Sequence, residues 1–236
     1  MTLDASYLGT VVPFPQRFVE QSQPGIRNAA RAPLSMLTAQ IVRATFTDVS
    51  TADTDGVSAS HAGAAVAGTT NMTIGGVLAT AGVATFVTPR NAVITVTHGS
   101  AVVDMSGTIT GTDQYGRVIA EAWSVTAGGT TKTFTGVVAF KTITSITETI
   151  AADASANTII AGDGVVLGLP FRSVIGGVAT AVKEIAIGAI AVTGTLVAGS
   201  TTANTDYRGT YLPSAAPNGT NDYSVWYLCE DVSVQP

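Results

Sequence analysis

The sequence predicts an all-β protein, a β-sandwich of jelly-roll-like topology preceded by an extended N-terminal arm. Short runs of Thr, Val, Ile and aromatic residues recur between Gly-, Asn- and Asp-centred breaks, at roughly the 8–12-residue spacing of sandwich strands. No amphipathic helix of normal length is visible. Only 11 % of the residues are charged, whereas 46 % are hydrophobic. We therefore expect a large core and a surface that is either neutral and hydroxyl-rich or covered by other subunits.

Residues 1–34 are predicted to form the arm, and residues 35–236 the β-sandwich domain. Four prolines interrupt the arm, and proline removes a ladder hydrogen bond and restricts the residue before it. The arm is too apolar for a disordered tail, so we expect it to lie on its own domain or on a neighbouring subunit. Its predicted partner-binding residues are Tyr7, Phe14, Arg17, Phe18, Arg27 and Arg31.

Individual strands are predicted from the alternation of apolar and polar residues. Residues 39–46 place Val42, Ala44 and Phe46 on one face, and residues 223–229 alternate in the same way. We expect further strands at residues 72–78, 82–89, 91–100, 101–112, 117–125, 131–140 and 141–149, and two within 185–199.

Three segments are predicted as connections. Residues 48–71 are polar and small, which is typical of a long loop. The sequence DQYG at residues 113–116 predicts a hairpin turn with Gly116 at the position of positive φ. Residues 162–168, GDGVVLG, lack the GxGxxG pattern and a following helix, so we interpret them as a turn that leads into a strand.

Charge and hydropathy exclude two classes of partner. The net charge is −5 with no basic run, which argues against binding nucleic acid. The N-terminus has no signal-peptide pattern. The most apolar stretch, residues 185–199, is shorter than the ~20 residues of a spanning helix, so no membrane contact is expected. The single cysteine, Cys229, is expected to be a buried small hydrophobe.

No constellation of residues indicates catalysis, so we expect no enzyme activity, no cofactor and no metal site. His61 and His98 lie outside metal-binding motifs and are interpreted as loop and turn residues. Neither a G-x-S-x-G elbow nor a phosphate-binding loop occurs. Glu121, in the middle of a strand, is expected to face solvent or to form a salt bridge rather than to transfer protons.

One acidic cluster leaves an alternative open. Asp48, Asp53 and Asp55 resemble the beginning of a Ca²⁺ loop, but the remaining ligands and the closing Glu are missing. A solvated loop is the preferred interpretation, and cation binding stays open.

Two arginines in the β region are candidate partner contacts. Arg172 ends the sequence GLPFR, and Arg208 stands between tyrosines in DYRGTY. The planar donors of an arginine can hold backbone carbonyls or carboxylates across an interface. The alternative is that both are exposed arginines at strand ends.

Between Gly107 and Leu228 the chain resembles structural proteins of tailed-bacteriophage virions. The similarity lies in TGTDQYGRVIAEAW, TFTGVVAFKTITSIT, GDGVVLGLPFR and DYRGTYLPSAAPNGTNDYSVWYL. These matched positions are turns and strand faces, so no functional residue carries over. The resemblance implies a virion protein made in the host cytoplasm, and is greatest to capsid decoration (cement) proteins.

The implied role is to bind the outside of a phage capsid and to stabilise contacts between major capsid proteins. The implied partners are the major capsid protein and further copies of the chain, as a homo-oligomer such as a trimer. Two alternatives stay open. One is a tail or head–tail adaptor protein, and the other is a carbohydrate-binding β-sandwich whose exposed aromatics would be Trp123, Trp226 and Tyr207.

Overall fold

The computed structural model describes residues 40–173, 181–186, 189–191, 194–199 and 208–229. Every regular element within these ranges is a β-strand, which confirms the all-β prediction. The described part of the chain therefore contains no helix that could cross a membrane. The arm, its six predicted partner-binding residues and the boundary at residue 34 lie outside the described residues.

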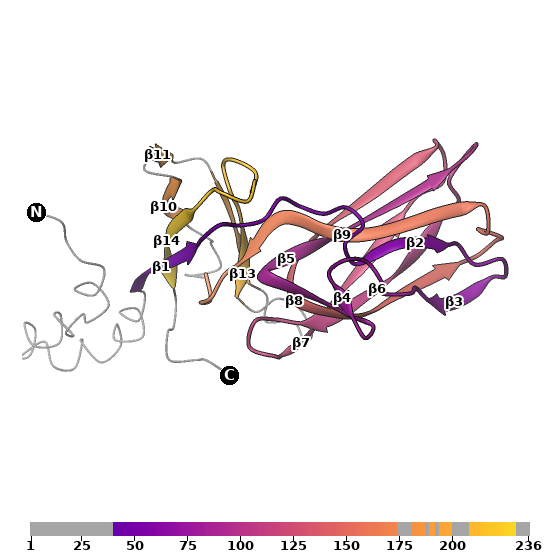
Figure 1. Ribbon diagram of the computed structural model, residues 1–236, viewed down its shortest axis with the longest axis horizontal. Coiled ribbons are helices and arrows are strands. Elements are labelled where there is room, and N and C mark those ends of the chain that lie inside the picture. The colour runs from indigo at the N-terminus through magenta and orange to yellow at the C-terminus, as the bar shows by residue number, and fades with distance from the viewer. Residues whose placement is uncertain (1–39, 174–180, 187–188, 192–193, 200–207, 230–236) are drawn as a thin grey trace, which may run out of the picture.

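The described residues form fourteen strands in two sheets, in which all neighbours are antiparallel (Figure 1). The small sheet has the order β1-β14-β10-β11, and the large sheet has the order β12-β13-β9-β5-β8-β6-β7. Three short strands lie outside this linear order: β2 pairs with β9, β3 with β8 and β4 with β5. The strands are β1 (Gln40–Phe46), β2 (Ser58–Ala62), β3 (Gly68–Asn71), β4 (Ala79–Thr80), β5 (Val83–His98), β6 (Met105–Thr112), β7 (Val118–Val125), β8 (Thr131–Ile150), β9 (Asn157–Gly168), β10 (Ala181–Ala186), β11 (Ala189–Ala191), β12 (Thr195–Ala198), β13 (Gly209–Leu212) and β14 (Tyr223–Cys229).

The large sheet curls around its own hydrophobic core. The core is made by inward-facing side chains of β5 to β9, among them the fully buried Ile94, Ile109, Trp123, Phe140 and Ile159. The long strand β8 makes the curl possible, because it pairs with β5 along its first part and with β6 along its second.

A second core joins the small sheet to one end of the large sheet. Ala44 and Phe46 of β1 and Tyr223, Val225 and Tyr227 of β14 are buried there. They meet three residues of the large sheet and the segment after β9: Leu167, Leu169 and Tyr211. The alternation predicted for β1 and β14 is therefore confirmed, and so is the burial of Cys229.

The strand order limits how far the sandwich prediction holds. A jelly roll has eight strands in two packed sheets, whereas this chain has a long curled sheet and a short sheet at its end (Figure 1). A sandwich-like all-β fold is supported, and the jelly-roll topology is not confirmed.

Two predicted strand breaks are wrong. Residues 82–89 and 91–100 form the single strand β5, and residues 131–149 belong to the single strand β8. Pro89 does not end β5, because the pairing of β5 with β8 is irregular between Thr85 and Arg90. A bulge tolerates the missing N–H of proline.

Four further local predictions are wrong. The expected loop 48–71 contains β2 and β3, and the expected strand 72–78 is not a strand. The expected turn at 162–168 lies inside β9. Gly162 serves close packing instead, since a Cβ there would stand 1.8 Å from the carbonyl oxygen of Asp53. Residues 185–199 hold parts of three strands rather than two.

Candidate interface at the junction of the two sheets

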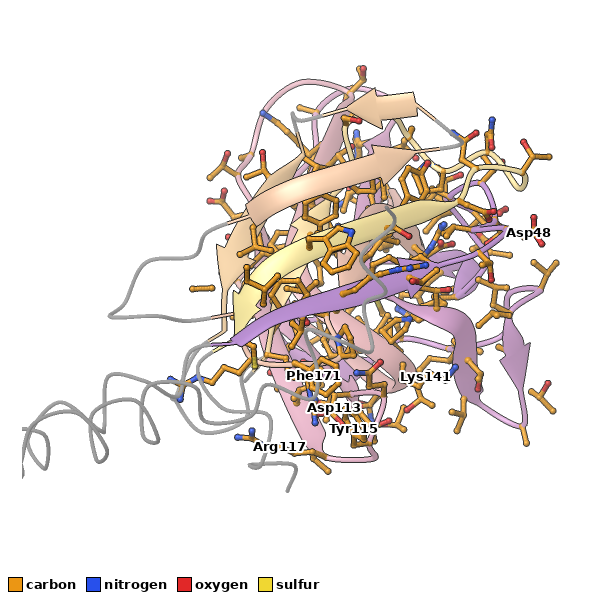
Figure 2. The ribbon with its side chains drawn as sticks, turned by 90° about the vertical axis from the view of Figure 1, so that its left-hand side faces the viewer. Asp48, Asp113, Tyr115, Arg117, Lys141 and Phe171 are labelled. Carbon is orange, nitrogen blue, oxygen red and sulfur yellow. The ribbon has the colours of Figure 1, made fainter. Side chains whose placement is uncertain are left out.

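Three segments far apart in the sequence meet where the small sheet joins the large one. They are the turn between β6 and β7, the segment 169–173 after β9, and Arg208 before β13. The Tyr115 hydroxyl donates to the carbonyl oxygen of Pro170 at 3.1 Å, and the Gln114 amide donates to that of Leu169 at 3.3 Å. Figure 2 shows Asp113, Tyr115, Arg117 and Phe171 grouped together.

The β6–β7 turn is held by Asp113. One carboxylate oxygen of Asp113 accepts the N–H groups of Tyr115 at 2.8 Å and Arg117 at 3.0 Å. Gly116 has a φ of 82°, a conformation that glycine adopts without strain. The hairpin turn predicted from DQYG is therefore confirmed.

Arg208, which is buried, binds this turn from the interior side of the protein. Its guanidinium pairs with the second carboxylate oxygen of Asp113, and its central carbon lies 4.0 Å from the centre of the Tyr115 ring. Arg208 is 5 % exposed and Asp113 4 %. Removing one member of such a buried pair leaves an uncompensated charge, so the pair fixes the turn against β13.

The segment after β9 is tied to β13 and β14. The Tyr227 hydroxyl donates to the carbonyl oxygen of Phe171 and accepts its N–H, both at 3.1 Å. Burial raises the pKa of Tyr227 well above its usual range. The N–H of Ser173 donates to the carbonyl oxygen of Arg208 at 3.0 Å. The junction is therefore a connected polar network between the two sheets.

The outer side of the junction is aromatic and cationic. Tyr115 is 42 % exposed, and Arg117, Phe171 and Arg172 are half-buried. Tyrosine and arginine are the residue types enriched at the energetic centres of protein interfaces. The two predicted partner contacts thus differ: Arg172 belongs to this surface, whereas Arg208 lies beneath it and binds within the subunit.

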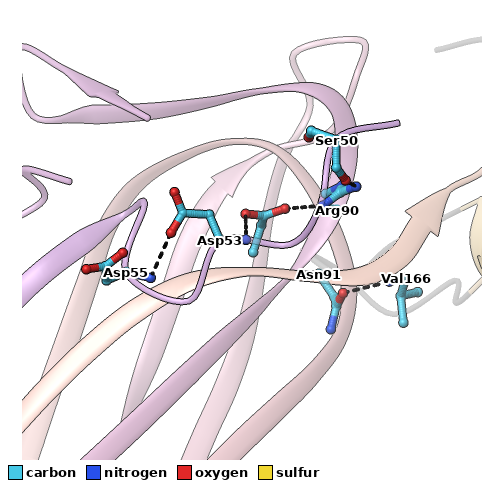
Figure 3. A network of polar contacts seen from close by, with 7 residues as sticks. Ser50, Asp53, Asp55, Arg90, Asn91 and Val166 are labelled. Carbon is cyan, nitrogen blue, oxygen red and sulfur yellow. Dashed lines mark hydrogen bonds and ion pairs between the residues drawn. The ribbon is translucent and has the colours of Figure 1, made fainter. Parts of the chain in front are cut away.

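A second buried network lies on β5 and β9 (Figure 3). Arg90 pairs with Asp163 and also donates to the carbonyl oxygen of Ser50. The other oxygen of Asp163 accepts the N–H of Asp53 at 2.9 Å. These contacts hold the segment before β2 against β9, so they build the fold rather than a surface site.

Asn91, next to Arg90, bridges the irregular part of the β5 ladder. Its amide donates to the carbonyl oxygen of Gly136 at 2.8 Å and its side-chain oxygen accepts the N–H of Val166 at 2.9 Å. The buried side chain thereby replaces main-chain bonds that the bulge removes.

The acidic cluster predicted around residue 50 does not gather into one site. Asp53 and Asp55 are neighbours, with the N–H of Asp55 donating to the Asp53 carboxylate at 3.3 Å. Asp48 lies elsewhere, and its N–H donates to Asp222 at 2.9 Å. Within the described residues no three His, Cys, Asp or Glu side chains are placed to hold a metal ion.

Glu121 and His61 make contacts that sequence reasoning missed. The Glu121 carboxylate accepts the N–H groups of Val137 at 2.7 Å and Val138 at 3.3 Å, which joins β7 to the first half of β8. His61 is a strand residue of β2 rather than a loop residue, and its Nε2 lies 3.2 Å from the buried Glu148. A glycine at position 136, which makes room for Glu121, was the one local signal available.

His98 behaves as predicted for a turn residue. It ends β5, and its Nδ1 accepts the N–H groups of Ser100 at 2.8 Å and Ala101 at 2.9 Å. The ring therefore caps the turn that leads toward β6.

The aromatic residues considered for a sugar site are not an exposed platform. Trp123 is 1 % exposed, and its indole N–H donates to the carbonyl oxygen of Thr147 at 2.9 Å. Trp226 is half-buried with Arg43 above its ring at 5.9 Å. Tyr207 lies outside the described residues.

Comparisons of the chain with protein-family models, with curated proteins and with solved structures find no match. The polar groups of the junction hold segments of the chain together, and its outer part carries the Tyr115 ring together with Phe171, Arg117 and Arg172.

Proposed function

We propose that the chain is a structural subunit of a tailed-phage virion, and within it a capsid decoration protein. In this role it binds the outside of the capsid and stabilises contacts between major capsid proteins. The observation that carries the proposal is the meeting of DQYGR, LPFR and RGTY, three of the segments in which the resemblance lies, at one buried network. These contacts give the three segments a structural role within the fold, which a framework protein requires.

The outer faces of the large sheet give further support. Outward residues of β6 and β8 are mostly hydroxyl residues, among them Thr110, Thr112, Thr142 and Thr144, with Val137 and Lys141 of β8 as exceptions. Some pair across strands, as Thr112 does with Thr142 at 2.7 Å. This end of the face lies next to the β6–β7 turn, and a neutral surface there can meet a neighbouring subunit without the cost of burying charge.

The proposal assigns capsid binding to two parts of the chain. The arm, residues 1–34, would lie on a neighbouring subunit, with Phe14 and Phe18 as apolar contacts. The junction surface around Tyr115 and Arg172 would provide the second contact. Many weak contacts repeated by capsid symmetry then add up to firm attachment.

The test uses capsid shells of the source phage that lack this protein. The full chain is expected to decorate them at saturating occupancy, and a chain of residues 35–236 is expected to lose most of the binding. Circular dichroism and thermal melting show whether the shorter chain still folds. Full occupancy by the shorter chain would contradict the role of the arm, and failure of the full chain to bind would contradict decoration.

A matched pair of variants tests the junction surface. Arg172→Ala should weaken shell binding, whereas Arg43→Ala, an exposed arginine on the small sheet, should not. Equal binding by both variants would remove the junction from the proposed interface.

A further inference from the structure

A shallow groove lies on the outer face of β3, β6, β7 and β8, away from the junction. Its volume is about 510 Å³, within the usual range of ligand-binding sites. Gly107 and Ala122 line the groove without adding bulk, which keeps it open. Six hydroxyl side chains line it: Thr69, Ser106, Thr108, Ser124, Thr147 and Thr149.

Half of these hydroxyls are already used by the protein. The hydroxyls of Thr69 and Thr149 bond to each other at 2.8 Å, and that of Thr147 accepts the N–H of Thr108 at 2.9 Å. The side-chain hydroxyls of Ser106, Thr108 and Ser124 make no hydrogen bond to any described residue. These three lie on the adjacent strands β6 and β7, so their spacing follows the sheet, about 5 Å across strands and about 7 Å along one.

The lining defines the chemical class of a ligand. No charged residue lines the groove, so it offers no opposite charge to an anion or a cation. The Trp123 ring is buried, so stacking on an aromatic face is absent from this groove. What remains is a set of hydroxyls, each able to donate one hydrogen bond and to accept two. Such a set is matched by a neutral ligand that itself carries several hydroxyls.

We propose that this groove binds a neutral saccharide. Ser106 and Thr108 of β6 and Ser124 of β7 hydrogen-bond the sugar hydroxyls, and the paired Thr69 and Thr149 form one wall. A site with hydroxyl contacts alone binds weakly, with a Kd on the order of 1 mM. Firm adhesion to a glycan surface would then need many copies side by side, and this last step rests on the proposed function.

The test measures binding to the isolated full chain by NMR. Uniformly ¹⁵N-labelled protein is titrated with neutral tetrasaccharides (maltotetraose, cellotetraose and chitotetraose) and with a sulfated heparin tetrasaccharide. We expect saturable shifts at Ser106, Thr108 and Ser124 with at least one neutral sugar. The triple variant S106A/T108A/S124A should weaken binding at least tenfold, because each lost hydrogen bond costs about fivefold in affinity.

Two further variants keep the result interpretable. Ala122→Gln fills the groove without removing a hydroxyl and should also weaken binding. T95A/T133A removes a hydroxyl pair at 3.4 Å on strands β5 and β8 outside the groove, and should bind as the unaltered chain does. The amide spectrum of each variant reports whether its fold is preserved.

Three results would overturn the proposal. They are no shifts with any neutral sugar up to about 20 mM, undiminished binding by the triple variant, and a preference for the sulfated sugar. Because the isolated chain is used, failure here says nothing against capsid decoration. A chain that binds sugar but not capsids would contradict only the proposed function.

Discussion

Replacing Arg208 by methionine tests whether the junction depends on its buried ion pair. Methionine retains much of the apolar length of arginine but removes the guanidinium that pairs with Asp113 and covers the Tyr115 ring. The Asp113 carboxylate would stay buried, with only the N–H groups of Tyr115 and Arg117 as partners. The structure therefore predicts a large loss in the free energy of unfolding.

The magnitude follows from what remains at the site. Removing one partner of a buried ion pair costs about 3–5 kcal/mol. The two main-chain donors still stabilise the carboxylate, which places the loss at the lower end, about 3 kcal/mol. Asp113→Asn removes the charge and keeps an oxygen for both N–H groups. The double variant R208M/D113N should therefore lose less free energy of unfolding than the sum of the losses of the two single variants, by at least about 1 kcal/mol.

Urea unfolding followed by circular dichroism and tryptophan fluorescence measures these differences. Agreement of the two probes establishes whether the two cores unfold together, which the comparison requires. Arg43→Met is the control, because Arg43 is exposed and lies over Trp226 at 5.9 Å, and it should cost less than about 1 kcal/mol. A loss below about 1 kcal/mol for Arg208→Met would refute the reasoning.

Three other substitutions test the packing, a turn and a buried hydroxyl. Gly162→Ala should cost about 2 kcal/mol or more in urea unfolding because its Cβ would meet the Asp53 carbonyl at 1.8 Å, whereas Gly75→Ala, with nothing nearer than 3.8 Å, should be neutral. Ala81→Asn should raise the unfolding free energy by about 0.5 kcal/mol, since Ala81 has a φ of 52° in the two-residue turn between β4 and β5; a loss would contradict this. Because burial raises the pKa of Tyr227, the unfolded chain releases this proton first, near pH 10, and stability should fall above that pH by up to about 1.4 kcal/mol per unit. Tyr227→Phe should remove this part of the fall of the unfolding free energy with pH in the alkaline range. An unchanged fall would show that Tyr227 ionises in the folded protein.

The parts of the fold that sequence predicts are those encoded by neighbouring residues. The alternation in β1 and β14 places one face in a core wherever the strands pair, and the DQYG turn depends on its own four residues and the next. Pro89 and Gly162 were misleading for the opposite reason. Each is explained by a feature that other parts of the chain provide, an irregular ladder with β8 for Pro89 and the segment before β2 for Gly162.

The candidate site was predicted only in fragments. The sequence singles out Arg172, Arg208 and the β6–β7 turn, but Asp113 and Arg208 are 95 positions apart and Arg90 and Asp163 are 73 apart. No local pattern specifies such a pairing, because a buried arginine and an exposed one look alike in sequence. The same holds for Glu121, whose partners are main-chain groups of another strand.

The proposed function places the chain in a phage virion, and its location and copy number in purified particles test that proposal most directly. Cryo-electron microscopy of the particle, with quantitative mass spectrometry of the same preparation, gives both. Decoration predicts density matching the two-sheet fold across the whole outer capsid, with copies on the order of hundreds repeated by the symmetry of the shell. Density confined to one vertex or to the tail would contradict decoration and favour a tail or adaptor protein. Absence from the particle would contradict a structural role in the virion altogether.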